Sequence, residues 1–404
     1  MPNFVISSMK NIFYFFYIIT LVSYSSEETY SQVYNANYAA VVNQCSSSNI
    51  LNNLTEYEAL GVKRRGTVAL DNTLTWLKNK YLSFGYTASQ ITEDSYTYTG
   101  STSICKNLIV TKIGTVYPNK FIIIDGHYDS LNGTGTNDNG SGLVCILEVA
   151  RLLQNIPTQY SIKFINFSGE EDGLFGSQHF VSAVVNATTP KMDIKLVFNL
   201  DEVGGVAGLV NNTITCEHDI SAPTTNNATS DVVTNELITC VGLYSPLSTF
   251  LDRAYSSDYM PFQSNNEVIT GFFEKNETTH KHTTTDFLIY MDPTYNYNVA
   301  KAAIGAMLHF AVVDTSLTNE EFKSGFQGSI YPNPANDTLY VNCGKLDRNY
   351  SFKLIDLLGK TIITKSFEMA SQNEAISISE IPKGVYLAVI ESDGNNYTKK
   401  IIIN

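Results

Sequence analysis

The chain has 404 residues, of which 16% are charged and 43% are hydrophobic, and its formal net charge is −13. This length allows one large domain and a smaller one, and the hydrophobic content predicts a packed core rather than a disordered chain. A strongly acidic chain lacks the basic face that nucleic-acid binding requires, so we expect no nucleic-acid partner.

The N-terminal segment has the organisation of a secretory signal peptide. Met9–Asn11 includes a lysine and precedes an apolar run at Ile12–Val22, which small polar residues follow at Ser23–Ser26. This pattern is typical of an export signal, which we assign to residues 1–25. A membrane anchor is the alternative, but the run is short for a bilayer span, and no later segment is apolar enough. We therefore expect a protein that is secreted or held at the outer cell surface.

The region after the signal contains one clear helix, from about Thr67 to Phe84, and Gly85 is well placed to end it. Two strands are predicted next, at Asn107–Thr111 and Phe121–Ile124. The second is a continuous apolar run, which favours a strand buried on both faces of a sheet.

The stretch Phe121–Glu171 is the centre of the chain's organisation. After its first strand come a polar loop, an amphipathic helix at Leu143–Leu153 and a second buried strand at Ile162–Phe167. A strand–helix–strand order predicts two parallel strands joined by a crossover. Both strands then end at one edge of the sheet, which is where open α/β sheets bind ligands.

The same alternation continues to about residue 314. We predict a helix at Phe175–Val185, a strand at Leu196–Leu200, a loop-rich insertion at Gly204–Asn235, a strand at Val268–Phe273 and a helix at Val299–Val313. Residues 26–314 are therefore expected to form one α/β domain with a mostly parallel central sheet flanked by helices.

The character of the chain changes after this point. Residues 315–328 are polar and are predicted to be a linker. Short β-rich runs separated by turn residues then fill residues 329–404, which predicts a small all-β sandwich. The runs are Thr338–Val341, Phe352–Ile355, Thr361–Thr364, Ile376–Ile378, Val385–Ile390 and Lys400–Ile403.

Carboxylates and imidazoles follow successive predicted strands of the α/β domain. They are His127 and Asp129, Glu170 and Glu171, Asp201, and His282, with Asp138 in the loop before the central helix. Carboxylates crowded at one sheet edge repel each other unless a cation neutralises them. Imidazole mixed with carboxylate suits Zn²⁺, and five or six ligands suit two ions that share a bridging carboxylate. We therefore predict a site for two zinc ions.

Two further roles can be read from the same residues. Of the adjacent carboxylates Glu170 and Glu171, one can bind metal while the other transfers protons. Asp129 is placed to accept the second ring N–H of His127. Of His280 and His282, one is expected to be a ligand and the other a residue at the rim of the site.

The cysteines are too sparse to form the scaffold of an exported chain of this length. Cys145 lies in the predicted core helix and is expected to be a buried thiol. Cys216 with Cys240, and Cys45 with Cys105, could form disulfides, but sequence alone does not settle the pairing.

The segment from Cys105 to Phe310 resembles the secreted di-zinc aminopeptidases of the bacterial leucyl aminopeptidase type. The resemblance rests on GHYDS, NDNGSG, FSGEEDGLFGS, FNLDEVGG, YSSDYMPFQS and HKHTTTDFLIYMDPT, in the order that the family has them. It implies a zinc-peptidase/phosphorylase-like fold, two zinc ions, and substrates that are peptides with free N-termini. The implied zinc ligands are His127, Asp138, Glu171, Asp201 and His282.

The resemblance also implies roles for individual residues. Asp138 would bridge the two ions, Glu170 would be the general base, and Asp129 would support His127. Tyr255 aligns with a tyrosine that binds the oxyanion in some family members, although Tyr259 stands where the family's SDH motif has histidine. The TTTD sequence after His282 is what selects it over His280 as the ligand.

The C-terminal segment resembles the sorting domain of the type IX secretion system. YPNPANDTLYVN, FKLIDLLGKTI and GVYLAVIES carry the resemblance, which implies the bacterial export machinery as a partner. A carbohydrate-binding or adhesive β-sandwich is the alternative for this segment. For the whole chain, a glutaminyl cyclase-like enzyme and a metal-free receptor on the same fold are the alternatives to an aminopeptidase, and carboxypeptidase or endopeptidase action also stays open.

Overall fold

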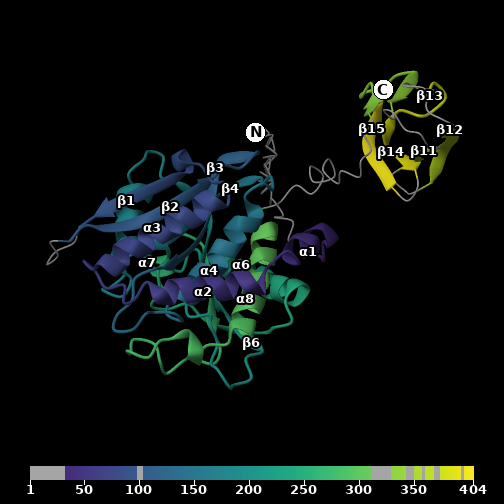
Figure 1. The fold of residues 1–404 in the computed structure, drawn as a ribbon. Helices are drawn as coiled ribbons and strands as arrows, with labels where there is room; N and C mark the ends of the chain where they lie inside the picture. The colour runs from purple at the N-terminus through teal and green to yellow at the C-terminus, as the bar shows by residue number, and fades with distance from the viewer. Residues whose placement is uncertain are drawn as a thin grey trace, which may run out of the picture.

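The computed structural model describes residues 32–97, 103–311, 329–342, 350–356, 360–367, 374–392 and 395–404. Figure 1 shows the chain. The predicted signal at 1–25, the predicted linker at 315–328 and Cys343 lie outside these ranges. Among the described residues, no helix combines the length and the apolar character that crossing a bilayer requires.

The α/β domain is built around an eight-stranded mixed sheet with the order β1-β2-β4-β3-β5-β8-β6-β7. Its four middle strands, β4, β3, β5 and β8, are mutually parallel. The strands are β1 (Ile91–Tyr96), β2 (Cys105–Lys112), β3 (Tyr117–His127), β4 (Tyr160–Phe167), β5 (Asp193–Leu200), β6 (Thr213–His218), β7 (Ser248–Arg253) and β8 (Ile269–Glu274). The predicted α/β class with a mostly parallel sheet is confirmed.

Helices cover both faces of this sheet (Figure 1). One core cluster joins α1–α4, α6 and α8 to one face, and a smaller cluster joins α5 and α7 to the other. The helices are α1 (Ala36–Val42), α2 (Ser47–Ala59), α3 (Val68–Ser83), α4 (Gly140–Leu153), α5 (Phe175–Phe180), α6 (Asn227–Tyr244), α7 (Tyr259–Ser264) and α8 (Pro293–Phe310). Short helical turns lie at Ala88–Gln90, Val181–Val185 and Leu288–Tyr290.

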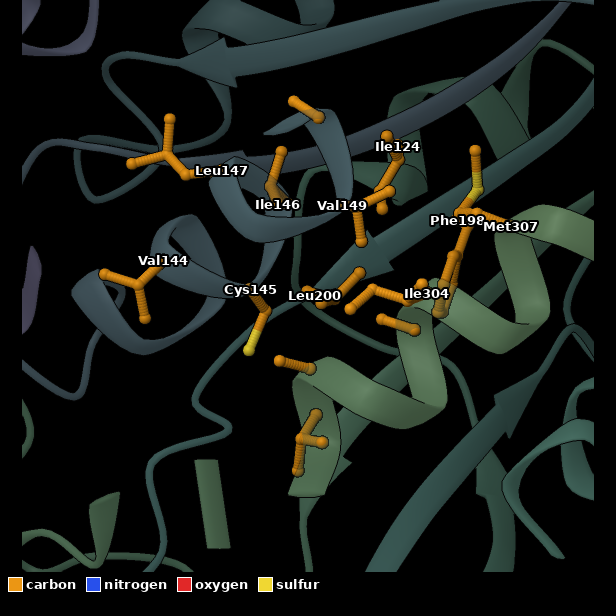
Figure 2. Close-up of a cluster of buried hydrophobic side chains, with 14 of the residues drawn as sticks. Ile124, Val144, Cys145, Ile146, Leu147, Val149, Phe198, Leu200, Ile304 and Met307 are labelled. Carbon is orange, nitrogen blue, oxygen red and sulfur yellow. The ribbon is translucent and has the colours of Figure 1, made fainter. Parts of the chain in front are cut away.

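The core explains why the apolar runs of the central stretch become buried strands and a buried helix. Figure 2 shows Ile124 of β3 and Phe198 of β5 beside residues of α4 and α8, such as Ile146 and Ile304. All four side chains are completely buried. Burying a side chain of this size contributes about 1.5–3 kcal/mol, so this packing fixes the sheet whose strand ends carry the site.

The prediction of a loop-rich insertion at Gly204–Asn235 is wrong. This segment contains β6 and the first half of α6, and β6 pairs with β7 and β8 inside the main sheet. Its apolar residues Ile214 and Cys216 face one core while polar residues alternate with them. A six-residue strand with polar residues at every second position resembles a loop when only composition is considered.

The helix predicted at Val299–Val313 begins earlier, because Asp292 caps α8 at Pro293. The Asp292 carboxylate accepts hydrogen bonds from the backbone N–H groups of Thr294 and Tyr295. Proline at the first position of a helix behind such a cap is a usual start signal. The described helix ends at Phe310, and Val313 lies outside the described residues.

The described residues from Ser329 onward form a two-sheet β-sandwich, as predicted. Its sheets have the orders β13-β10-β9 and β12-β11-β14-β15, and they share one hydrophobic core. The strands are β9 (Ser329–Tyr331), β10 (Thr338–Asn342), β11 (Tyr350–Asp356), β12 (Thr361–Phe367), β13 (Glu374–Ser377), β14 (Gly384–Ser392) and β15 (Asn395–Ile403).

The five described cysteines are all buried and free. The pairings Cys216–Cys240 and Cys45–Cys105, which the sequence left open, are therefore not formed. The prediction that Cys145 is a buried thiol is confirmed.

Candidate metal centre and substrate cavity

The polar residues predicted at the strand ends lie at one edge of the sheet. His127 is the last residue of β3, and Asp201 directly follows β5. Glu170 and Glu171 follow β4 after Gly169, whose φ of +76° is a conformation that favours glycine. Parallel strands deliver their carboxyl ends to one side, and this brings residues distant in sequence together.

Five of these side chains form two groups that share Asp138. The first group is His127, Asp138 and Asp201, and the second is Asp138, Glu171 and His282. Within each group the candidate ligand atoms lie within 4.8 Å of one another. This is the arrangement that two adjacent metal ions with a bridging carboxylate require.

The distances within the two groups are short. His127 Nε2 lies 3.2 Å from Asp138 Oδ1 and 3.4 Å from Asp201 Oδ1. His282 Nε2 lies 3.0 Å from Asp138 Oδ2 and 3.2 Å from Glu171 Oε2. The two oxygens of Asp138 therefore face different imidazoles.

The chemistry of this donor set fits zinc. Asp138 Oδ2 and Asp201 Oδ1 are buried and have no hydrogen bond of good geometry to a described residue. Buried carboxylate oxygens are costly unless a donor or a cation satisfies them. Two imidazoles and three carboxylates without thiolate are ligands that Zn²⁺ accepts.

The charges of the cluster shift each group's pKa. Burial would lower the pKa of His127, but the carboxylates of Glu170, Asp201 and Asp138 raise it well above its ordinary value. Burial would raise the pKa of Asp138, but the two imidazoles outweigh it and hold that pKa below its ordinary value. The carboxylates of Asp138 and Glu171, which face Nε2 of His282, raise the pKa of His282 to about 10. Without a metal, the imidazoles therefore act as the cations of the cluster.

Asp286 fixes the loop that carries Asp138. Its carboxylate accepts the backbone N–H groups of Asn137 at 2.9 Å and Asp138 at 3.1 Å. The peptide bond between Asp138 and Asn139 is cis, and the Asn139 side chain caps α4. The loop is thus held from both sides, which orients the shared carboxylate.

Asp129 contacts the cluster in two ways. Its backbone carbonyl lies 3.2 Å from His127 Nδ1, while its carboxylate Oδ1 is 3.7 Å from that nitrogen. The carboxylate instead accepts the backbone N–H groups of Glu170 and Glu171, each at 3.3 Å. Asp129 therefore orients both the imidazole and the loop with the paired glutamates.

Glu170 stands beside the first group without belonging to either. Its Oε2 lies 3.9 Å from His127 Nε2. Burial raises the pKa of Glu170 well above its ordinary value, and the carboxylates of Asp201, Asp258 and Asp129 raise it further. A carboxyl group with a raised pKa near a reaction centre is suited to proton transfer.

His280 and Tyr255 belong to neither of the two groups. His280 stacks on Tyr290 with ring centroids 3.9 Å apart, and its Nδ1 lies 2.7 Å from Thr285 Oγ1. Tyr255 is about half exposed, and its ring lies 6.3 Å from that of Phe273. Of the two histidines, His282 is the one that contacts the carboxylates.

A cavity of about 390 Å³ opens next to the cluster. The cluster residues Asp138, Glu171, Asp201 and His282 form one wall together with Glu170. The remaining lining includes Glu202, Glu217, Tyr255, Tyr259, Phe273 and Lys281. Its volume lies within the range of small-molecule binding sites.

Sequence reasoning missed several residues that shape the site. Asp286 ends the TTTD sequence, which selects His282 as a ligand but does not predict the hydrogen bonds of Asp286 to the Asp138 loop. Ser257, within YSSDY, donates a hydrogen bond to Asp201 Oδ2 at 2.7 Å. Lys63 is buried, and its ammonium group donates to the carbonyl of Thr134 in the loop before Asp138. Glu217 carried no signal, because its segment was predicted to be a loop.

Family comparisons agree with this geometry. Residues 107–307 match the model of "Peptidase family M28", and residues 329–404 match the "Secretion system C-terminal sorting domain". The first match contains every residue of the two groups.

Two curated relatives are aminopeptidases. Aminopeptidase YwaD of Bacillus subtilis is 42% identical over 84 residues, which cover 20% of this chain and 18% of that protein. An aminopeptidase of Pseudomonas aeruginosa is 30% identical over 135 residues, which cover 33% of this chain and 23% of that protein. The chain thus spans less than a quarter of the length of these two relatives.

Solved structures share the fold. The LapA aminopeptidase of Legionella pneumophila has a TM-score of 0.58 at 22% identity, covering 69% of this chain and 77% of that chain. The glutaminyl cyclase of Macrostomum lignano has a TM-score of 0.61 at 13% identity, covering 70% and 95%. Enzymes with two different activities therefore share this fold, and it does not choose between them. Both family matches, together with the geometry of the strand ends, identify residues 107–307 as a peptidase family M28 domain and residues 329–404 as a secretion system C-terminal sorting domain.

Proposed function

We propose that this protein is a zinc aminopeptidase that removes N-terminal residues from peptides. The observation that carries the proposal is the pair of ligand groups that share Asp138, with Glu170 beside them at the cavity. The two relatives that are aminopeptidases, from Bacillus subtilis and Pseudomonas aeruginosa, support the same reaction.

The ligands in this proposal are His127 and Asp201 for one zinc ion and Glu171 and His282 for the other, with Asp138 shared. Bound zinc would polarise the scissile carbonyl and lower the pKa of the attacking water. Asp129 and Asp286 would act as positioning residues, because they hold the backbone on which the ligands stand.

Glu170 is the proposed general base. It would take a proton from the attacking water and deliver it to the nitrogen of the leaving amine, so that the proton is conserved between the two steps. The position of Glu170 at the cavity, with its Oε2 3.9 Å from His127 Nε2, supports this role. Tyr255 lines the cavity, and we propose that its hydroxyl group donates a hydrogen bond to the developing oxyanion.

A free N-terminus is the proposed recognition feature of the substrate. The cavity wall carries the carboxylates of Glu170 and Asp201 next to the place where the carbonyl must react. The α-nitrogen lies only two bonds from that carbonyl carbon, about 2.5 Å away. An α-ammonium group would therefore meet these carboxylates, whereas a blocked N-terminus would bring no positive charge.

The sorting domain indicates export or surface attachment of the protein. We propose that residues 1–25 are a signal peptide, that residues 26–314 form the peptidase domain, and that residues 315–328 link it to the sorting domain at residues 329–404. The bacterial export machinery is the partner proposed for that last domain.

Hydrolysis of leucyl-p-nitroanilide and its N-acetylated form, with and without a chelator, tests the aminopeptidase assignment. We expect the free substrate to be cleaved, the acetylated one to be left intact, and the chelator to abolish activity until zinc is restored. Equal cleavage of both substrates would contradict exopeptidase action. Cyclisation of N-terminal glutamine without peptide cleavage would indicate a cyclase, and a protein without bound zinc or turnover would indicate a receptor.

A further inference from the structure

The floor of the cavity carries Glu217 on β6, a carboxylate with no cationic partner among the residues that the structure describes. In the sheet, Glu217 lies opposite Gly271 of β8, which in turn lies opposite Asn199 of β5. Val197 and Ile269 lie two residues before Asn199 and Gly271, and both belong to the core under α5 and α7. Since residues two apart in a strand point to the same face, Asn199, Gly271 and Glu217 share the face that α5 and α7 cover. Asp201 and Phe273 stand two residues further along the same face. Glu217 therefore lies one level below the metal-binding wall.

Gly271 makes room for this carboxylate. A Cβ atom at position 271 would lie 2.8 Å from Glu217 Oε2 and 2.8 Å from Tyr259 Cε1. Both distances are too short for real contacts, so a side chain at Gly271 would displace the floor. The glycine lets Glu217 lean across β8 toward the middle of the cavity.

Among the described residues, the hydroxyl group of Tyr259 is the hydrogen-bond partner of the Glu217 side chain, at 2.7 Å, and no lysine, arginine or histidine forms an ion pair with it. Glu217 is only 3% exposed, and the surface that it retains faces the cavity. Burial raises the pKa of Glu217 to about 8, because the surroundings offer the charge little compensation. A cation entering the cavity would favour the ionised form.

Glu202 is the other acidic residue of the cavity lining that lies outside the candidate metal-binding wall, and unlike Glu217 it has a cationic partner. Its Oε1 lies 3.2 Å from the ammonium nitrogen of Lys281. Lys281 also pairs with Glu277 at the rim. The cation that lines the cavity is therefore already engaged, and Glu217 is the acid left to meet a ligand.

We propose that Glu217 is a specificity-determining residue that selects substrates with a cationic N-terminal side chain, lysine or arginine. This inference rests on the proposed aminopeptidase function. The α-ammonium group must stay beside the metal cluster, because it is two bonds from the reacting carbonyl. Glu217 lies on β6, which is separated from β5 by β8, so the backbones of β5 and β6 are about 10 Å apart. A long side chain directed away from the reacting carbonyl covers part of that distance, and the Glu217 carboxylate, which reaches over Gly271 of β8, covers the rest, so the ammonium or guanidinium group can pair with it.

The test compares the p-nitroanilides of lysine and norleucine, whose side chains have similar length and differ in charge. The zinc-loaded wild-type protein should have a higher kcat/KM for the lysyl substrate. In Glu217→Gln, kcat/KM for the lysyl substrate should fall by about 10- to 100-fold, chiefly through KM, as expected for a buried charge-assisted contact. The norleucyl value should change by less than about threefold, since its side chain makes no charged contact.

Asp252→Asn is the matched control. Asp252 lies directly opposite Glu217 on β7 but is exposed and outside the cavity lining. The Asp252→Asn substitution removes one negative charge, as Glu217→Gln does, but from the neighbouring strand. It should leave the preference for the lysyl substrate unchanged. Equal losses on both substrates in Glu217→Gln, or a wild-type protein that does not prefer the lysyl substrate, would overturn the inference. Since the wild-type comparison needs no variant, poor folding of Glu217→Gln would not prevent the test. Failure to cleave either substrate would instead refute the proposed function.

Discussion

At the wall of the cavity that carries the two candidate ligand groups, three carboxylates face two imidazoles, whereas at its floor Glu217 faces only the hydroxyl of Tyr259 among the described residues. The wall shows short contacts and pKa shifts of both signs, because each charged group has an opposite neighbour. At the floor, burial acts almost alone and raises the pKa of Glu217. Acidic residues that share one cavity can therefore serve different purposes: the crowded ones suit a metal, and the isolated one suits a substrate cation.

The largest effect that separates these roles is expected from Glu170→Gln. The variant keeps the size of the side chain but loses its basicity, so kcat should fall by about 10²- to 10⁴-fold while zinc stays bound. Steady-state kinetics together with elemental analysis measures both quantities. Asp172→Asn is the control in the same loop, because Asp172 pairs with Arg65 at 3.3 Å and does not line the cavity. Unchanged kcat in Glu170→Gln would remove Glu170 from the mechanism.

A smaller effect at the wall is expected from Asp129→Asn. The amide cannot accept both backbone N–H groups of Glu170 and Glu171 as the carboxylate does. Residues that orient metal ligands typically change metal affinity or activity by about 10- to 100-fold when they are replaced. Zinc affinity from competition with a chelator should weaken within that range. An affinity equal to that of wild type would show that Asp129 does not hold the ligands in place.

The smallest effect concerns an imidazole outside the cavity, His309 on α8. Burial lowers its pKa to about 4, and its Nε2 lies 2.8 Å from the Tyr244 hydroxyl. In the unfolded chain the pKa of His309 is about 6.5. Between about pH 6.5 and 4 the unfolded state therefore binds more protons than the folded state, and the folded state loses stability as the pH is lowered. The Tm of the wild type should therefore drop more between pH 7 and 5 than that of His309→Gln. An equal drop in both proteins would show that the pKa of His309 is not lowered in the folded protein.

The wall was predictable from sequence and the floor was not, for a physical reason. Strands β3, β4 and β5 are buried on both faces, and their apolar runs are visible before the polar residues that end them. Glu217 lies on β6, where polar and apolar residues alternate over six positions and composition indicates a loop. Its role depends on register with Gly271 and on the contact with Tyr259, which no local pattern encodes.

The same contrast explains the details of the wall. The side chains that provide candidate ligands follow strands in order and could be predicted. The Asp286 contacts with the Asp138 loop join residues almost 150 positions apart, and they appear only when the chain is folded. The Asp129 carboxylate was expected to accept a hydrogen bond from His127, but its hydrogen bonds to the Glu170–Glu171 backbone depend on the path of the next loop.

The zinc content of the purified protein tests the shared Asp138 site most directly. Elemental analysis of the wild-type protein, after removal of loosely bound metal, should give two zinc ions per chain. Asp138→Asn should bind fewer, because the shared carboxylate that serves both groups is weakened. A wild-type protein that holds one zinc ion or none after equilibration with zinc would contradict the two-metal site.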